Sequence, residues 1–326
     1  MATKELTYAQ AINEAISQEM RRDKKVFMMG EDIGLYCGAF GVSKGMVQEF
    51  GPERIRDTPI SERAYVGAAI GAAMAGMRPI CELMFSDFMA VCYDELANEA
   101  PKMRFMFGGK VQVPMVMRTP SGGGTGAAAQ HSQSLEAILC HIPGLKLVIP
   151  STPYDAKGLM ISAIRDNNPV YVLEQKLLYR TKGMVPEEEY TIPLGEANIR
   201  REGTSITIVT YGRMVKMCLD AAEELKADNI DCEVIDIRSL VPLDIDAITK
   251  SVKKTKHCLI VHEAVKFGGF GAEIASEINE SDAFYYLDAP VSRLGMMSCP
   301  VPFNPTLERE VMPTVPKIVA KVKELV

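Results

Sequence analysis

The chain has 326 residues, of which 47% are hydrophobic and 24% are charged, so it is long enough for two globular domains. Its formal net charge of -6 argues against nucleic acid as the main partner, because phosphate binding needs clustered cations. No apolar run reaches the ~20 residues that span a bilayer, and the first residues lack the apolar core of a signal peptide. We therefore expect a cytoplasmic protein with no nucleic-acid partner and no membrane partner.

The cysteines and histidines form no metal-binding motif. No two of the 8 cysteines have the C-x-x-C spacing of zinc or thioredoxin-like sites, and no pair of histidines forms H-E-x-x-H. Most of the cysteines lie in apolar stretches, where we expect them to act as small buried hydrophobes: Cys81, Cys92, Cys140, Cys218, Cys232 and Cys258.

Strand-like apolar runs alternate with helix-like segments in the first half of the chain, as in a parallel sheet covered by helices. Helices are expected at about 7–22, 62–77, 87–103 and 155–165. Strands are expected at 26–30, 79–85, 113–118, 145–150 and 169–174. Thr7 and Ser61 stand where N-caps would begin the first two helices.

A polar stretch with Pro186, three consecutive glutamates and Pro193 then interrupts this pattern and predicts a linker. A second α/β unit follows, with strands expected at 205–211, 232–237 and 257–263 and helices at about 214–226, 245–253 and 272–279. The last segment, 315–326, predicts an amphipathic helix. The expected domains are thus 1–180 and 204–326, joined by a linker at 181–203.

The helix expected at 62–77 is rich in glycine and alanine, with Gly67 and Gly71 one turn apart. Each glycine costs a helix roughly 1 kcal/mol relative to alanine, so this face predicts the close approach of another backbone. A contact within the chain and a contact with another subunit explain the pattern equally well. The sequence leaves these two alternatives open.

Two glycine-rich stretches invite a phosphate-binding interpretation. SGGGTGAA at 121–128 follows an expected strand, as phosphate-binding loops do, but it lacks the G-K-[ST] of a Walker loop. We therefore expect a mobile loop that covers a binding site rather than a phosphate-binding loop. FGGFGAE at 267–273 resembles G-x-G-x-x-G, but Ile274 stands where the third glycine is needed. Neither stretch predicts a nucleotide site by itself.

Glu62 and His131 have surroundings that suggest chemistry. Ile60, Tyr65 and Val66 would desolvate Glu62, and a desolvated carboxyl can hold a proton near neutral pH. The alternative is that Glu62, in the first turn of a helix, only makes a favourable electrostatic interaction with the helix dipole. His131 lies among polar residues where the glycine-rich loop meets a helix, which suits proton transfer better than a place on an apolar face.

Six motifs together resemble the beta subunits of pyruvate dehydrogenase-type thiamine-diphosphate enzymes. They are GED (30–32), DTPISE (57–62), RPICELMFSDF (78–88), AAQHSQ (128–133), PGLKLVIPSTPYDAKGL (143–159) and AIRDNNPV (163–170). The resemblance runs through the whole chain, and RFMFGGK (104–110) and VTYGRM (209–214) are most similar to the acetoin dehydrogenase branch. It implies an α/β fold with two parallel-sheet domains, a thiamine-diphosphate pyrimidine-binding domain followed by a transketolase C-terminal-like domain.

The same resemblance implies a thiamine-diphosphate-dependent subunit that is active only with an alpha subunit, in an α2β2 heterotetramer. The substrate would be acetoin or pyruvate, with a branched-chain 2-oxo acid as the alternative. The acyl unit would pass to a lipoyl domain of an acyltransferase core. The diphosphate and magnesium motif of the family, Gly-Asp-Gly followed by Asn, is absent from this chain, so the alpha subunit would hold the magnesium ion.

The resemblance also assigns roles to residues. Glu62 matches the family's glutamate that hydrogen-bonds the pyrimidine ring of the cofactor and promotes its imino tautomer. Phe88 matches the aromatic residue that stacks on that ring, and Met84 and Ile60 are expected beside it. Glu31 matches an acidic residue that serves a proton relay inside the tetramer. His131 matches a histidine that transfers a proton during reductive acylation of the lipoyl group.

AIRDNNP further resembles a loop that binds a structural potassium ion. The alternative is an ordinary helix C-terminus that Asn167 and Pro169 close. The expected ligands are oxygen atoms of five residues: Met115, Ala163, Ile164, Asp166 and Asn168.

Two other functions remain open from the sequence. One is a binding subunit that keeps the fold without the chemistry, although Glu31, Glu62 and His131 are all present. The other is a nucleotide-binding dehydrogenase, which would need an intact G-x-G-x-x-G. The sequence favours the catalytic subunit over both.

Overall fold

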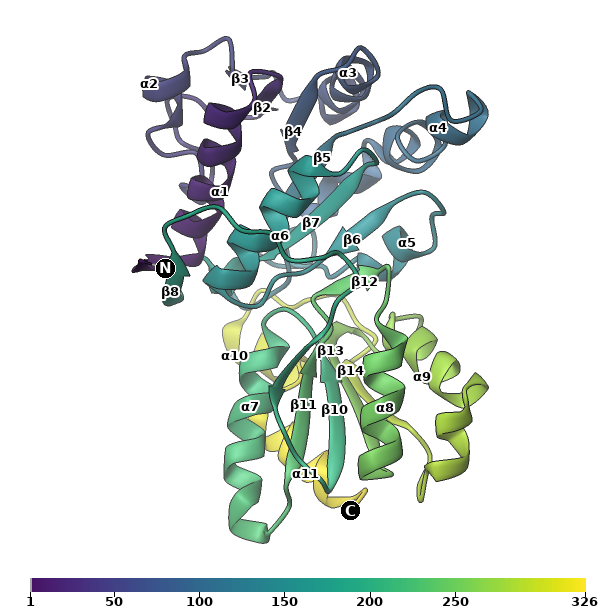
Figure 1. Ribbon diagram of the computed structural model, residues 1–326. Coiled ribbons are helices and arrows are strands. Elements are labelled where there is room, and N and C mark those ends of the chain that lie inside the picture. The colour runs from purple at the N-terminus through teal and green to yellow at the C-terminus, as the bar shows by residue number, and fades with distance from the viewer. Residues whose placement is uncertain (1) are drawn as a thin grey trace. The chain divides into compact units, whose positions relative to one another are not determined.

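Two mainly parallel β-sheets organise residues 2–326, which the computed structural model describes (Figure 1). The first compact unit consists of residues 2–121 and 138–194, and the second of residues 122–137 and 195–326. The short segment 122–137 therefore belongs with the second unit, although most of its sequence neighbours belong to the first. The predicted α/β class is confirmed.

The strands of the first unit's main sheet follow the order β6-β7-β5-β4-β2-β3, and every neighbouring pair is parallel. Their bounds are Val26–Gly30 (β2), Ile55–Asp57 (β3), Arg78–Glu82 (β4), Val116–Ser121 (β5), Lys146–Val148 (β6) and Val170–Gln175 (β7). Most of these residues are buried, which explains the continuous apolar runs in the sequence.

One face of this sheet is covered by α1 (Tyr8–Arg22) and α6 (Pro153–Arg165), which pack against each other. The side chains of Tyr8, Ile12 and Ile16 are fully buried, as their helical spacing predicts. Thr7 caps α1 through a reciprocal capping box with Gln10, so its predicted role is confirmed. Helix α3 (Glu62–Met74) packs on β4.

One local prediction was confirmed only in position, and another was wrong. Ser61 does occupy the N-cap position of α3, but its side chain makes no capping hydrogen bond. The single helix expected at 87–103 is instead a 3-10 turn η1 (Ser86–Ala90), a π-helical turn η2 (Glu95–Glu99) and a short α4 (Met103–Met106). Pro101 lies inside the expected helix and has no N–H to donate, which is one reason why a continuous helix does not form.

The segment 181–203, expected as a linker, contains two strands. β8 (Lys182–Pro186) pairs antiparallel with β1 (Thr3–Thr7) in the first unit, and neither strand was predicted. β9 (Asn198–Arg201) pairs antiparallel with β11 (Cys232–Asp236) in the second unit. In this part of the chain, residues up to 194 belong to the first unit and residues from 195 onward belong to the second.

The second unit has a five-stranded sheet in the order β14-β13-β10-β11-β9, in which only β9 is antiparallel to its neighbour. Its strands also include β10 (Ile206–Thr210), β11 (Cys232–Asp236), β13 (Cys258–Val265) and β14 (Ser292–Met296). β14 was not predicted, because its residues are only partly buried and lack a strong apolar pattern.

Alternate residues of β10 contact different helices. Ile206 and Ile208 join the apolar core formed with α7 (Met214–Leu225) and α11 (Val315–Lys323). The hydroxyl of Thr207 instead lies 2.6 Å from those of Ser251 and Thr255 on α8 (Ile245–Thr255). This alternation places α7 and α11 on one face of the sheet and α8 on the other (Figure 1).

The remaining elements are short or lie toward the C-terminus. They are α2 (Met46–Phe50), α5 (Glu136–Cys140), η3 (Lys176–Leu178), η4 (Lys226–Asp228), β12 (Ser239–Val241), α9 (Gly271–Glu280), η5 (Asp282–Tyr286) and α10 (Pro305–Val311). No helix within residues 2–326 is both long and apolar enough to cross a membrane.

The stretch FGGFGAE serves packing around a histidine. A Cβ atom added to Gly269 or Gly271 would come within 2.7 Å of the ring of His262, which is fully buried. A Cβ on Gly295 would also lie 2.9 Å from that ring. These glycines let the backbone approach the imidazole closely, which accounts for a sequence that only partly resembles a dinucleotide fingerprint.

Candidate functional site

Glu62 lies in the first turn of α3, and its side chain is buried with 7% of its surface exposed. Tyr65 and Val66, on the following turn, are buried beside it as the sequence predicted. Ile60 does not contribute to this burial, because its side chain is 83% exposed. The expectation that Ile60 desolvates Glu62 within the chain was therefore wrong. Ile60 lies outside α3, because Ser61, the residue that precedes the helix, has non-helical backbone angles.

Glu31 directly follows β2 and is buried at the same end of the first unit's sheet as Glu62. Burial raises the pKa of Glu31, and the nearby charge of Glu62 raises it further, while the Tyr65 hydroxyl opposes the rise. The Oε1 atom of Glu31 is buried without a hydrogen-bond partner among residues 2–326. Burial and a neighbouring like charge both disfavour the charged form of a carboxyl group, so Glu31 is the titratable group that this environment perturbs.

Met84 and Phe88 follow the neighbouring strand β4, and both side chains are half-buried. β2 and β4 are parallel neighbours, with Gly30 opposite Glu82, so Glu31, Met84 and Phe88 all emerge at the carboxyl edge of the sheet. Ligands of open α/β sheets bind at this edge. The geometry thus brings together four of the residues that the sequence selected, counting Glu62.

Phe88 is held by other aromatic rings. Its ring lies edge-on to Phe85 at 5.7 Å between centroids, and Phe85 in turn lies edge-on to Phe40 at 5.9 Å. The amino group of Lys176 sits 5.4 Å from the centre of the Phe85 ring. An aromatic side chain held in this way presents a stable face for a planar ring.

A buried ion cluster supports the same edge. Arg118 on β5 is 1% exposed and forms two hydrogen bonds of 2.7 and 2.5 Å with the carboxylate of Glu174 on β7. It also pairs with Glu82 at the end of β4. The hydroxyl of Tyr179 donates to Glu174 at 2.7 Å. These contacts tie three adjacent strands together below the candidate site.

His131 belongs to the second unit, on the segment 122–137, and its side chain is half-buried. The same segment carries the glycine-rich loop. The structure therefore places the candidate residues in both units, with Glu31, Glu62, Met84 and Phe88 in the first and His131 in the second.

The expected potassium ligands are already engaged in hydrogen bonds. Nη1 of Arg78 donates to the carbonyl oxygens of Ile164 and Asp166, both at 2.9 Å. The carbonyl of Met115 accepts from the backbone of Val170 at 3.0 Å. A guanidinium thus supplies positive charge to two of the oxygens that were expected to face an ion.

Tyr65 was not selected from the sequence as a site residue. It is 3% exposed, its hydroxyl interacts with the side chain of Glu31, and burial followed by the charges of neighbouring groups raises its pKa. Its position three residues after Glu62 on a helix was the available signal, because such residues share one face.

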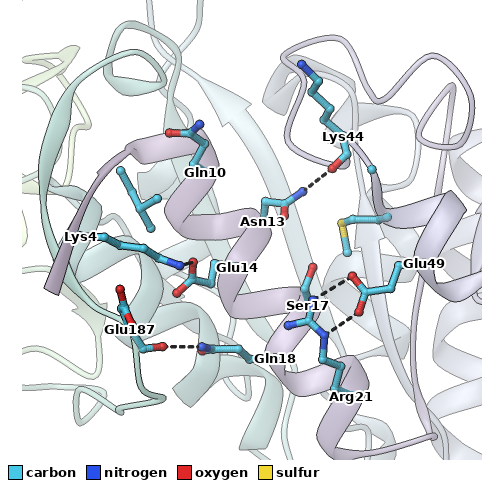
Figure 2. Close-up of a pocket in the computed structure, with 13 residues that line it drawn as sticks. Lys4, Gln10, Asn13, Glu14, Ser17, Gln18, Arg21, Lys44, Glu49 and Glu187 are labelled. Atoms are coloured by element: carbon cyan, nitrogen blue, oxygen red, sulfur yellow. Dashed lines mark hydrogen bonds and ion pairs between the residues drawn. The ribbon is translucent and has the colours of Figure 1, made fainter. Parts of the chain in front are cut away.

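A polar pocket of about 440 Å³ runs along α1 (Figure 2). Its charged side chains largely pair with one another, with Lys4 2.6 Å from Glu14 and Arg21 2.5 Å from Glu49. Among residues 2–326, no group of three or more His, Cys, Asp and Glu side chains is arranged to hold a metal. The carboxyl edge with Glu62 is therefore the better candidate site.

Comparison with known proteins places this architecture in one class. Residues 4–182 match the family described as transketolase, pyrimidine binding domain, and residues 195–318 match transketolase, C-terminal domain. A solved structure described as a split-gene transketolase in an inactive beta4 tetramer has a TM-score of 0.80 at 21% identity and covers 98% of this chain and 97% of its own. The fold is accordingly that of the two-domain transketolase class, in the order expected from the sequence.

Close relatives narrow the class. The beta subunit of acetoin:2,6-dichlorophenolindophenol oxidoreductase from Bacillus subtilis is 48% identical over 98% of this chain and 97% of its own length. The pyruvate dehydrogenase E1 beta subunit of Rickettsia felis is 47% identical over 98% of both chains. A 2-oxoisovalerate dehydrogenase beta subunit from Bacillus subtilis is 45% identical over 98% of both chains. The chain belongs to the family of beta subunits of thiamine-diphosphate-dependent acetoin and 2-oxo acid dehydrogenases.

Proposed function

We propose that this chain is the beta subunit of an acetoin-cleaving or pyruvate-decarboxylating component, active only with an alpha subunit in an α2β2 heterotetramer. The observation that carries the proposal is the buried carboxyl of Glu62 beside Glu31, at the carboxyl edge of the first unit's sheet. The described residues suit the aminopyrimidine end of thiamine diphosphate, since Oε1 of Glu31 is buried and has no hydrogen-bond partner within residues 2–326. When bound, thiamine diphosphate supplies an electron sink for breaking a bond next to a carbonyl.

Each residue at the edge has a proposed task. Glu62 hydrogen-bonds the pyrimidine ring, and its burial lets it exchange a proton there rather than with bulk water. Phe88 stacks on the ring, with Met84 beside it. Ile60, whose side chain is exposed in the single chain, covers the ring or the adjoining alpha chain. Glu31 holds a proton that Glu62 can receive.

The proposed alpha subunit holds the magnesium ion and the diphosphate. The sequence supports this division because it lacks Gly-Asp-Gly. Several large apolar side chains of the first unit are also exposed in the single chain, as in a surface that another subunit covers: Leu35, Tyr36, Ile60, Phe105 and Met106.

His131 is proposed to transfer a proton while the acyl unit passes to the lipoyl group of an acyltransferase core. Its place on a half-buried loop segment, rather than in the apolar core, supports this task. Acetoin is the first substrate to test, because the motifs 104–110 and 209–214 are most similar to that branch. Parallel assays with pyruvate and branched-chain 2-oxo acids would identify the substrate.

The decisive experiment replaces Glu62 by glutamine in the assembled heterotetramer. Glutamine keeps the size of the side chain but cannot exchange a proton, so we expect turnover to fall by about 10²–10⁴-fold. The rate of acetoin-dependent reduction of 2,6-dichlorophenolindophenol measures this loss, and size-exclusion chromatography verifies assembly.

The matched control is Glu53→Gln, since Glu53 lies in the same unit with its side chain 89% exposed. It should leave turnover unchanged. Near-normal turnover of the Glu62→Gln enzyme would overturn the proposed role of this carboxyl, whereas loss of assembly would mean that Glu62 is structural.

A structural potassium ion is the last part of the proposal, with ligands on Met115, Ala163, Ile164, Asp166 and Asn168. The ion would share carbonyl oxygens with Arg78, which already donates to two of them. Replacing potassium by choline should lower the melting temperature of the assembled enzyme. An unchanged melting temperature would mean that Arg78 alone satisfies these carbonyls.

A further inference from the structure

The backbone of the glycine-rich loop binds anions, and the anions are carboxylates of the same chain. The N–H of Gly123 donates to Oε1 of Glu263 at 2.6 Å. Both oxygens of Glu308 are also used, because they accept from Gly124 at 2.7 Å and from Gly126 at 3.3 Å. The phosphate-loop interpretation of SGGGTGAA thus identified a real property of the backbone, whose N–H groups bind carboxylate oxygens.

The two glutamates are built into the second unit. Glu263 lies on β13 and Glu308 on α10, and each is only 3% exposed. Arg213 lies 3.4 Å from the other oxygen of Glu263. A buried carboxylate is stable only if hydrogen bonds replace its lost hydration, and the loop amides supply them.

The loop in turn requires glycine. A Cβ atom on Gly123 would lie 2.4 Å from the methyl carbon of Met312 and 3.1 Å from Oε1 of Glu308. Gly124 and Gly126 have φ angles of +92° and +68°, which side chains other than glycine rarely adopt. The glycines therefore let three amides converge on the two carboxylates.

Further contacts fix the ends of the segment that carries His131. The N–H of Gly122 donates to the carbonyl of Gln133 at 3.2 Å, which closes the loop on both sides of the histidine. The hydroxyl of Tyr211 donates to the buried carboxylate of Glu136 at 2.8 Å. Every one of these contacts lies within the second unit.

We propose that Glu263 and Glu308 are positioning residues that hold the segment 122–137 so that His131 meets the lipoyl group in a productive geometry. This inference rests on the proposed role of His131. A displacement of about 1 Å can cost a reaction ~10²-fold, so loosening the loop should slow acyl transfer without removing any reacting group.

The test uses Glu308→Ala and Glu308→Gln in the full β chain assembled with its alpha subunit. The matched control is Glu310→Gln, because Glu310 lies two residues further along α10 and is exposed. Hydrogen–deuterium exchange of peptides covering 122–135 reports on the loop directly. Loss of a charge-assisted hydrogen bond should speed exchange by roughly tenfold in the alanine variant, and by less in the glutamine variant, which keeps one acceptor oxygen.

Two activities are compared, acyl transfer from acetoin to a recombinant lipoyl domain and acetoin-dependent reduction of 2,6-dichlorophenolindophenol. For Glu308→Ala, acyl transfer should fall about tenfold or more beyond any fall in dye reduction, with partial recovery in the glutamine variant. Equal losses in both activities, or unchanged exchange in 122–135, would overturn the proposal.

His131→Ala separates this proposal from the proposed function. If His131→Ala leaves acyl transfer intact, the assigned role of the histidine fails, and the role of the glutamates in acyl transfer fails with it. The exchange data then still show whether the carboxylates hold the loop. Inactivity of the unmodified enzyme in both assays would instead contradict the proposed function itself.

Discussion

His262 illustrates how burial can control the charge of one residue. Its ring is fully buried against the glycines at 269, 271 and 295, and burial lowers its pKa to about 4. Nδ1 lies 3.1 Å from the carbonyl oxygen of Ala264, which opposes this shift, while the charge of Arg293 adds to it. The folded protein therefore keeps this imidazole neutral at pH values where an exposed histidine takes up a proton.

This difference predicts a pH dependence of stability. The unfolded chain binds a proton on His262 below its ordinary pKa of 6.5, whereas the folded chain does not until the pH approaches 4. Stability is thus fully present above pH 6.5 and is lost as the pH falls toward 4, and from pH 7.5 to 6.0 the loss through this group is about 1 kcal/mol. Urea unfolding of the wild-type chain and of His262→Asn should show a shallower pH slope in the variant. Equal slopes would contradict the assignment.

At the scale of single residues, the sequence predicted the burial of a side chain better than the direction in which that side chain points. Glu62 is buried as expected, since apolar neighbours along the helix sequence fold around it. Ile60 is two residues away and points outward, because the chain is not helical before Ser61. Cys140 is only partly buried, whereas Cys81, Cys92 and the other cysteines of apolar strands are buried. Side-chain direction at an element's end depends on backbone geometry that a residue pattern does not contain.

Among the elements, α3 resolves part of an ambiguity left by the sequence. A Cβ atom on Gly71 would meet nothing within 4 Å, and one on Gly67 would lie at an ordinary 3.7 Å from Glu95. Ala68 on the same helix and Ala75 at its C-cap are exposed. The close intrachain contact that would explain Gly71 does not form among the described residues, so a contact with another subunit is the alternative that remains.

Gly71→Ala tests that alternative. In the isolated chain the substitution should stabilise α3 by up to about 1 kcal/mol, because it removes backbone entropy from the unfolded state without a clash. If another subunit packs on this face, the same methyl group should weaken assembly with the alpha subunit. Urea unfolding measures the first effect and a titration of assembly the second. Stronger or unchanged assembly would show that Gly71 faces solvent in the complex.

Regular elements were predicted where periodicity was strong, and irregular ones were missed. The buried strands and the amphipathic helices α1, α6, α7 and α8 formed close to their expected bounds. The interrupted region 86–106 and the edge strands β1, β8 and β14 did not follow from the pattern. Edge strands are held by pairing with a distant segment, as Thr3 pairs with Pro186, so their own sequence carries little signal.

For the whole molecule, the division of the cofactor site between subunits makes a direct prediction. The chain supplies residues suited to the pyrimidine ring but lacks Gly-Asp-Gly, so alone it should bind thiamine diphosphate weakly even with excess magnesium. The assembled enzyme should bind it at least about 10²-fold more tightly, because the diphosphate then gains its magnesium and hydrogen-bond partners. Isothermal titration calorimetry on the isolated and assembled chains measures the difference. Tight binding by the isolated chain would contradict this division.

The sequence alone determined the two α/β domains, the family and the residues Glu31, Glu62, Met84, Phe88 and His131 as candidates. Only the tertiary structure decided that Glu31 and Glu62 share one buried environment, and that the glycine-rich loop is held by Glu263 and Glu308. Local pattern reports the period and burial of an element, because these depend on neighbours along the chain. Contacts between residues 140 or more positions apart depend on how the elements pack, which the local sequence pattern does not show.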